Sequence, residues 1–327
     1  MTTPSAHQDD RLIAPDVQGI EAAARALKDG KLVAFPSETV YGLGADATND
    51  HAVTAIYAAK DRPTFNPLIV HVASVEAAKR YVEFDDRAQR LCDAFCPGAL
   101  SLVLPRRPGS RLSLLVSAGL DSVAIRIPSH PIAQALLTAC QLPIAAPSAN
   151  PSGAVSPTQA SHVLNGWPDL TKEGPLLIID GGPCAIGLES TVLDLTTPTP
   201  ALLRPGGISL EEIEALIGRV TIATSDDNTP KSPGMLSRHY APDTPVRLNA
   251  IETQADELFL GFGPDHADKK FNLSLKGDLA EAAANLFSTL RLLDSLNANS
   301  IAIAPIPNHG LGRAINDRLS RAATPSS

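Results

Sequence analysis

The stretch KDRPTFNPLIVH, residues 60–71, leads the chain from the end of one predicted element into the next. A helix is expected over 51–60, with Asp50 as its N-cap, and a proline-containing turn follows it. PLIVHV, residues 67–72, is a short apolar run rich in β-branched residues, which predicts a buried strand. A helix, a turn and a buried strand in succession indicate a mixed α/β domain.

The same alternation of helices and strands continues on both sides of this stretch. Ile20, Ala23, Ala24 and Leu27 share one face of a helix expected over 17–29. Strands that alternate with helices place the chain in the α/β class. The other elements expected in this part are helices over 86–95 and 131–140 and strands over 32–35, 100–104, 123–127, 143–146, 176–179 and 191–194.

The length of 327 residues suits about two domains. Residues 221–245 are polar, rich in proline and serine and without hydrophobic periodicity, which is typical of an interdomain linker. We therefore expect a disordered tail over 1–12, a larger domain over 13–220 and a smaller α/β domain over 246–327. The elements expected in the smaller domain are strands over 258–262, 271–275 and 300–304 and helices over 279–293 and 310–322.

The overall composition narrows the class of protein. Hydrophobic residues make up 44% of the chain, which is enough for real cores, and the net charge of −8 argues against a general nucleic-acid binder. No apolar run approaches the roughly 20 residues that a membrane span needs, and the polar N-terminus does not resemble a secretory signal. Four scattered cysteines indicate reduced, packing thiols. A soluble, cytoplasmic α/β enzyme is the expectation.

Four polar side chains, Lys60, Arg62, Asn66 and His71, gather in the opening stretch. Two cations at a helix C-terminus can be solvated charges, and a histidine in an apolar strand can be a satisfied core residue. Clustered with an amide that donates and accepts hydrogen bonds, they instead suggest part of a polar site. Pattern alone leaves both interpretations open.

AFPSETVYGLGADA, residues 34–47, fits the loose dinucleotide pattern G-x-G-x-x-A. That pattern requires its glycines directly between a strand and a helix, whereas Pro36 to Tyr41 intervene here, which disfavours a nicotinamide site. The segment is expected to be a glycine-rich turn. Such a turn either only positions the chain or presents the hydroxyls of Ser37, Thr39 and Tyr41 to a small polar ligand.

Arg126 interrupts the apolar strand of SVAIRIP, residues 122–128. Strand alternation could place it on a wet face. If the guanidinium is buried it needs a paired anion, which a substrate carboxylate or phosphate would supply through a two-pronged contact.

Further polar loops follow strands later in the chain. They carry hydroxyls, an amide, an arginine and an aromatic residue, and each could also be an ordinary turn. No Walker A motif, Ser-His-Asp order or zinc-ligand spacing stands out, so any chemistry must work without an obvious protein nucleophile. The loops are AAPSANPSG at 145–153, GLESTVLD at 187–194, RPGG at 204–207 and RHYAP at 238–242.

As an ordered set, these segments resemble the YrdC-type domain of threonylcarbamoyl-AMP synthases over about 14–210. Residues 232–242 are similar to the linker of the two-domain form, and 310–323 to its closing helix. One departure is Ser37, where the family often has threonine. The resemblance implies a twisted mixed-sheet domain with flanking helices and a smaller Rossmann-like C-terminal domain. The matching segments are PSETVYGLG, KDRPTFNPLIVH, CPGALSLVL, SVAIRIP, APSANPSG, ESTVLD, LLRPGG, SPGMLSRHYAP and GLGRAINDRLSRAA.

The resemblance implies synthesis of threonylcarbamoyl-AMP and pyrophosphate from L-threonine, bicarbonate and ATP, with Mg²⁺ accompanying the nucleotide. The product would pass to a tRNA threonylcarbamoyltransferase. Lys60 and Arg62 would be catalytic, by stabilising phosphate charge. The residues implied for L-threonine are Thr39, His71, Arg126, Ala146 (through its backbone) and Ser190. Those implied for ATP are Lys60, Arg62, Asn66, Ser122, Ser148, Ser156, Arg204 and Tyr240.

Two other functions stay open at this point. Related domains bind double-stranded RNA, so a binding module without ATP turnover is an alternative, and a weak RNA contact is compatible with the enzyme. A YrdC-like domain also serves carbamoyl transfer in hydrogenase-cofactor maturation, although this chain lacks the extra segments of those proteins. Tyr240, in the expected linker, suggests a lid over a bound nucleotide. No protein metal site is expected.

Overall fold

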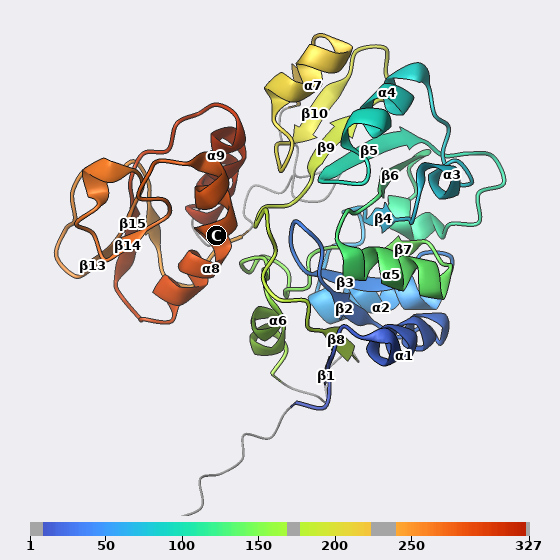
Figure 1. The fold of residues 1–327 in the computed structure, drawn as a ribbon, viewed down its shortest axis with the longest axis horizontal. Coiled ribbons are helices and arrows are strands. Elements are labelled where there is room, and N and C mark those ends of the chain that lie inside the picture. Colours follow the sequence, from blue (N-terminus) through green and yellow to red (C-terminus); the bar gives the residue numbers. More distant parts are fainter. Residues whose placement is uncertain (1–8, 169–176, 224–239, 325–327) are drawn as a thin grey trace, which may run out of the picture.

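The computed structural model describes residues 9–168, 177–223 and 240–324. These form a larger unit and a smaller unit side by side (Figure 1). Residues 1–8 of the expected tail and most of the expected linker, 224–239, lie outside the described residues. Leu12, expected in the tail, lies in a strand, and so does Thr221, expected in the linker, so both expectations are wrong at these positions.

In the described residues the larger unit is built on an eleven-stranded mixed sheet in the order β1-β8-β2-β3-β7-β4-β6-β5-β9-β10-β11. Neighbours in this order are mostly distant in sequence, so the sheet gathers segments from the whole of the larger unit. The strands are β1 (Leu12–Ile13), β2 (Val33–Phe35), β3 (Gly42–Asp46), β4 (Ile69–His71), β5 (Leu100–Pro105), β6 (Ser122–Arg126), β7 (Ile144–Ala145), β8 (Leu177–Ile179), β9 (Thr191–Asp194), β10 (Ala201–Arg204) and β11 (Thr221–Ile222).

Helices cover this sheet on both faces because each buries an apolar stripe. α1 and α5 pack with Phe35 and Ile144 in one core, while α2, α4 and α7 contribute Ile56, Leu91 and Ile213 to the other. The two cores fix the sheet between layers of helices. The helices are α1 (Val17–Lys28), α2 (Asp50–Lys60), α3 (Val75–Ala78), α4 (Asp86–Phe95), α5 (Pro131–Cys140), α6 (Ala160–Gly166) and α7 (Leu210–Ile217), with a 3-10 turn η1 (Leu114–Ser117).

The expected N-cap of α2 is wrong by one residue. The side chain of Asn49 accepts hydrogen bonds from the backbone N–H groups of His51 and Ala52, and Asp50 is the first residue of the helix. In the first turn the carboxylate of Asp50 still favours the helix, because the N-terminal end of a helix carries partial positive charge.

The glycine-rich segment is a strand and not the expected turn. Gly42–Asp46 forms β3, which pairs antiparallel with β2 and with β7. A Cβ atom on Gly44 would lie 2.8 Å from a ring carbon of Phe35 and 2.9 Å from a methyl carbon of Ile144. The glycine is therefore needed for close packing across the sheet, and the loose dinucleotide pattern is coincidental.

The smaller unit has a four-stranded sheet in the order β12-β15-β13-β14, all of whose pairs in the described residues are parallel. Its helices α8 and α9 lie on the side that faces the larger unit (Figure 1). Their core includes Val40, Val155, Leu188 and Tyr240, so the two units share buried apolar contacts. The elements are β12 (Val246–Arg247), β13 (Glu257–Gly261), η2 (Pro264–His266), β14 (Phe271–Asn272), α8 (Leu279–Asp294), β15 (Ser300–Ile303) and α9 (Leu311–Ala322).

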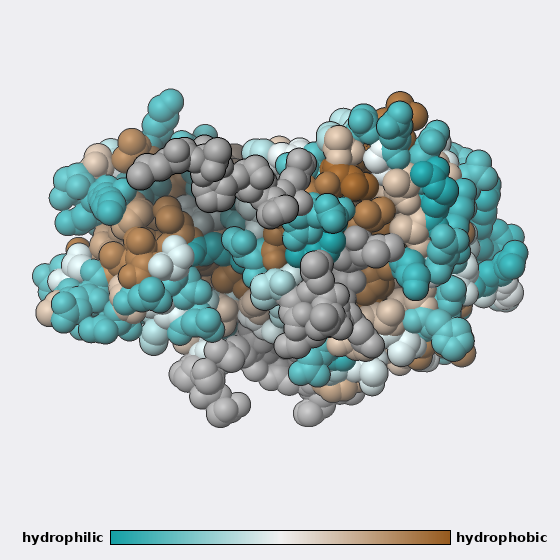
Figure 2. Space-filling view, turned by 90° about the horizontal axis from the view of Figure 1, so that it is seen from below, coloured by the Kyte–Doolittle hydropathy of each residue, from teal (hydrophilic) through white to brown (hydrophobic). Residues whose placement is uncertain are grey.

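On the face that Figure 2 shows, hydrophilic residues cover much of the surface and hydrophobic residues gather in patches between them. None of the helices in the described residues combines the length and hydrophobicity that a membrane crossing requires. The four cysteines are all free thiols, three of them buried, as the sequence predicts.

Candidate active site

A small polar cavity lies in the larger unit, close to the smaller one. Its volume is about 40 Å³, which is room for only a few water molecules at roughly 10–15 Å³ each by this measure. Its walls come from the strands β2, β3, β4, β6 and β10, the loops after β2, α2 and β7, the segment before β9, and Tyr240. The lining residues are Phe35, Ser37, Thr39, Val40, Gly42, Arg62, Ile69, His71, Arg126, Ala146, Pro147, Ser148, Glu189, Ser190, Arg204 and Tyr240.

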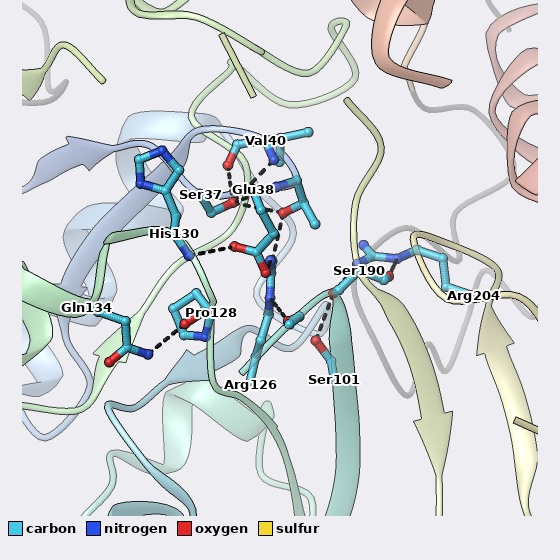
Figure 3. A network of polar contacts seen from close by, with 12 residues as sticks. Ser37, Glu38, Val40, Ser101, Arg126, Pro128, His130, Gln134, Ser190 and Arg204 are labelled. Atoms are coloured by element: carbon cyan, nitrogen blue, oxygen red, sulfur yellow. Dashed lines mark hydrogen bonds and ion pairs between the residues drawn. The ribbon is translucent and has the colours of Figure 1, made fainter. Parts of the chain in front are cut away.

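Arg126 lies in β6 and is buried, with 5% of its side chain exposed, so the wet-face interpretation is wrong. Its guanidinium donates to Glu38 Oε1 at 2.6 Å and to Thr39 Oγ1 at 2.8 Å, as Figure 3 shows for Glu38. The sequence predicts a substrate anion as the partner, whereas the protein supplies a carboxylate itself. Burial raises the pKa of Glu38, but the charge of Arg126 outweighs it and the pKa is lowered.

His71 faces Arg126 across the parallel β4–β6 pair. Its ring meets Phe35 edge-on at 6.1 Å between centroids, and its Nδ1 atom is buried without a hydrogen-bond partner in the described structure. Burial, with the charge of Arg126 adding to it, lowers the pKa of His71 to about 3. The imidazole is therefore neutral at physiological pH and leaves one nitrogen free for a ligand.

Ser190, directly before β9, is bonded to two neighbouring strands. Its hydroxyl lies 2.7 Å from that of Ser101 in β5, and Arg204 in β10 donates to the Ser190 carbonyl at 2.9 Å (Figure 3). Arg204 is itself buried, and burial lowers its pKa. These contacts hold a second buried cation, besides Arg126, at the wall of the cavity.

Lys60 and Arg62 are buried, so they are not the solvated charges that pattern alone allowed. The Lys60 ammonium donates to the Ser148 carbonyl at 2.7 Å and to the Asn150 carbonyl, while Arg62 donates to the carbonyls of Asn66 and Pro67. Burial lowers the pKa of both, that of Arg62 to about 10. Among the described residues neither has a carboxylate partner, so this side of the cavity favours anions.

All five residues that the resemblance assigns to threonine line the cavity, and so do Arg62, Ser148, Arg204 and Tyr240 of the ATP set. The other four lie outside the lining. Lys60 donates to backbone carbonyls of the loop at 148–150. Asn66 is buried with neither amide atom bonded in the described structure, and Ser156 donates to Glu189 Oε1 at 2.5 Å. Ser122 begins β6 opposite Pro105.

Three polar residues in or beside the cavity are not among those predicted from the sequence. Glu38 directly precedes Thr39, and Glu189 directly precedes Ser190. This adjacency to residues assigned to threonine is the sequence signal that could have identified the two glutamates. Arg318 in α9 donates to Glu189 Oε2 at 2.8 Å from 129 residues further along the chain. No local pattern predicts such a contact.

Comparisons with known proteins extend over almost the whole chain. A family model described as "Telomere recombination", which covers Sua5, YciO and YrdC proteins, matches residues 25–206. A second, described as "Threonylcarbamoyl-AMP synthase, C-terminal domain", matches residues 208–324.

Individual relatives agree with these models. A threonylcarbamoyl-AMP synthase of Bacillus subtilis is 44% identical over 336 residues, which cover 96% of this chain and 95% of the relative. One from Pyrococcus abyssi is 42% identical, covering 93% of this chain and 94% of the relative. The crystal structure of Pyrococcus abyssi Sua5 complexed with L-threonine matches with a TM-score of 0.85 at 40% identity, over 95% of this chain and 96% of that one.

Proposed function

Because the chain belongs to the threonylcarbamoyl-AMP synthase family, we propose that it converts L-threonine, bicarbonate and ATP into threonylcarbamoyl-AMP and pyrophosphate. The cavity carries this proposal, because it brings every residue assigned to threonine together with cations suited to phosphate. The product would serve threonylcarbamoyladenosine formation in tRNA, through a tRNA threonylcarbamoyltransferase of the cytoplasm.

The reaction needs no nucleophile from the protein. The threonine amine attacks the carbon of bicarbonate, and water leaves to give a carbamate. A carbamate oxygen then attacks the α-phosphorus of ATP, the bond to the β-phosphate breaks, and pyrophosphate leaves with the electron pair. The protein's task is to align these groups and to stabilise the charge that builds up on phosphate.

The cavity divides this task between its walls. Arg126, held by Glu38, would bind the threonine carboxylate, and neutral His71 with Ser190 would orient the amine and hydroxyl. Arg62 and Arg204 would face the phosphates, with Lys60 fixing the loop at Ser148.

Mg²⁺ would enter as part of the nucleotide substrate. Among the described residues no group of three or more histidine, cysteine or acidic side chains gathers around a metal position. Glu189, the carboxylate nearest the proposed phosphate wall, already accepts hydrogen bonds from Ser156 and Arg318. The residues present do not form a dedicated site for the ion, and we assign it no step.

A cavity of about 40 Å³ holds only a few water molecules, so we expect the site to widen when threonine and ATP bind. Tyr240 is buried, lines the cavity and stacks on Phe287 of α8 at 5.6 Å between ring centroids. We propose that the segment carrying Tyr240 moves aside to admit substrates and closes over the nucleotide as a lid.

The direct test is incubation of the protein with ATP, bicarbonate and single amino acids, with pyrophosphate release measured. We expect release that depends on both L-threonine and bicarbonate. Release indifferent to either would refute the proposed reaction. Binding of double-stranded RNA without turnover is the less favoured function, because the net charge is −8 and nothing in the cavity suits a duplex.

One variant tests whether Arg126 serves threonine binding and not ATP binding. Arg126→Ala should raise the KM for threonine by at least tenfold and change the KM for ATP little, because the guanidinium lies on the threonine side. Removing it leaves Glu38 buried without its partner, which costs about 3–5 kcal/mol of stability. Arg126→Ala/Glu38→Gln removes that penalty and should show the same raised KM for threonine with a little-changed KM for ATP. A selective loss of ATP affinity would contradict the assignment.

A further inference from the structure

Arg318 belongs to the smaller unit but contacts Glu189, a residue that lines the cavity of the larger one. It lies in α9 with none of its side chain exposed. Its Nε atom donates to Glu189 Oε2 at 2.8 Å, and its NH2 group donates to the carbonyl of Pro205 at 2.9 Å. One guanidinium thus fixes the residue before Ser190 and the residue after Arg204.

The same guanidinium also supports the aromatic residue at the cavity. Its central carbon lies 5.0 Å from the centroid of the Tyr240 ring, and Asp317 accepts from its NH1 group at 2.5 Å. An arginine over an aromatic face is an attractive arrangement, and it is stronger where water is excluded. Arg318 therefore contacts three separate segments that form the cavity or adjoin it.

Glu189 gives this contact its chemical importance. Glu189 lines the cavity and its carboxylate interacts electrostatically with Arg204, on the side where the nucleotide phosphates would lie. Burial raises the pKa of Glu189, but the charges of Arg318 and Arg204 outweigh it and lower the pKa, so the group stays ionised. Without Arg318, an uncompensated negative charge would face the phosphates and compete with them for Arg204.

We infer that Arg318 is a positioning residue for the nucleotide: by neutralising Glu189 and supporting Tyr240, it makes the docked smaller unit part of the ATP side of the cavity. This inference rests on the proposed function. It assigns the smaller unit a task in substrate binding that goes beyond packing against its neighbour.

The test compares Arg318→Met with Arg313→Met, a matched control on the same helix. Arg313 pairs with Glu211 of α7 at 3.3 Å, which also joins the two units but does not reach the cavity. For Arg318→Met we expect a KM for ATP at least tenfold higher and a KM for threonine changed less than threefold, because threonine carries no net charge. Arg313→Met should keep both values. Equal effects of the two variants would reduce Arg318 to a docking contact and overturn the inference.

A charge-removing second variant identifies the mechanism. In Arg318→Met/Glu189→Gln no carboxylate is left unpaired, so the KM for ATP should return to within about threefold of that of Glu189→Gln. A double variant as impaired as Arg318→Met would show that Glu189 does not transmit the effect. If Arg318→Met alone fails to fold, this double variant is the test, and its failure to fold as well would make Arg318 a fold anchor and overturn the inference.

Calorimetric titration with ATP provides a readout that does not depend on turnover. A tenfold or greater loss of ATP affinity in Arg318→Met, absent in Arg313→Met, supports the inference even if the wild-type protein releases no pyrophosphate with threonine. That latter result would refute the proposed reaction alone. Unchanged ATP affinity in a folded Arg318→Met protein would refute the role of Arg318 alone.

Discussion

At the scale of single residues, the cavity is a set of buried polar groups, some paired by the protein and some left for a ligand. Arg126 already has Glu38 as its partner, whereas His71 Nδ1 and the amide of Asn66 have none among the described residues. The sequence predicted that a buried arginine at this position needs an anion. It could not identify the anion, because Glu38 lies 88 residues away and only the fold brings the two together.

The amide of Asn66 gives the first prediction. A buried amide without partners costs about 1–3 kcal/mol, so Asn66→Ala should leave the free energy of unfolding of the ligand-free protein unchanged or raise it by about 1 kcal/mol. The same variant should lose about tenfold or more in ATP affinity, because the group is then missing as a ligand. Urea unfolding and ATP titration test the two halves. A clear loss of stability with intact ATP affinity would mean that the amide serves the fold.

The neutral state of His71 predicts a pH dependence. Its pKa is about 3 in the folded protein against an ordinary value of 6.5. A depressed folded pKa contributes stability that is complete above pH 6.5 and is lost as the pH falls from 6.5 through about 3. Glutamine does not titrate in this pH range. Between pH 7 and pH 3, His71→Gln should therefore lose about 2–4 kcal/mol less of its free energy of unfolding than the wild type loses.

Urea unfolding between pH 7 and pH 3 measures the effect. His51→Gln, which changes an exposed histidine on α2, is the control and should follow the wild type. Parallel curves for wild type and His71→Gln would show that protonation of His71 does not oppose folding.

At the scale of elements, periodicity predicted most helices and strands close to their observed bounds. The helix expected over 131–140 coincides with α5, because Pro131 opens an apolar stripe that runs to Cys140. The prediction of a turn at Gly42–Asp46 is wrong, because glycine in a sequence usually indicates a break in a strand. Gly44 is required here by close packing against Phe35, and this contact is not visible in the local sequence. The order of the strands could not be predicted, because sheet neighbours such as β5 and β9 lie far apart in the sequence and no local pattern shows which strands pair.

The segment between β10 and α7 gives a prediction at this scale. A Cβ atom on Gly206 would lie 2.4 Å from backbone atoms of Glu189, Ser190 and Thr191, and backbone cannot move aside cheaply. Gly206→Ala should destabilise the protein by about 1–3 kcal/mol and shift Ser190, with at least a tenfold loss in the rate of pyrophosphate release.

Gly109→Ala provides the comparison for this variant. A Cβ atom there meets nothing within 4 Å, although its φ of +75° adds about 1–2 kcal/mol of conformational strain. It should lose stability and keep activity. If Gly206→Ala also kept full activity, the close approach at residue 206 would be unimportant for Ser190.

At the scale of the whole molecule, the smaller unit packs against the larger one close to the cavity, and the two units share a buried core. Composition and the linker signal predicted two units, but not that they share a core or that Arg318 reaches Glu189. Docking depends on complementary surfaces that form only after each unit has folded, so local patterns carry no record of it. The role of Tyr240 was therefore predictable only from the resemblance.

The proposed lid at Tyr240 leads to a prediction of how fast a nucleotide enters the cavity. Tyr240→Ala removes the ring of the proposed lid, so the association rate constant for ATP should rise several-fold, because binding that awaits a conformational change is slow. Dissociation should accelerate more, and the affinity should fall. Stopped-flow binding measures both rates, and Tyr240→Phe should stay near the wild type. An unchanged association rate in Tyr240→Ala would mean that entry does not wait for this residue.

The pairing of Glu189 with Arg318 also has a consequence for biosynthesis. At about 5–20 residues per second, a ribosome adds Arg318 roughly 6–26 s after Glu189, because 129 residues separate them. During that interval the nascent larger unit holds a carboxylate whose counter-ion has not yet been translated. The inferred role of Arg318 therefore predicts that the growing chain binds nucleotide weakly until α9 has left the exit tunnel and can dock on the larger unit.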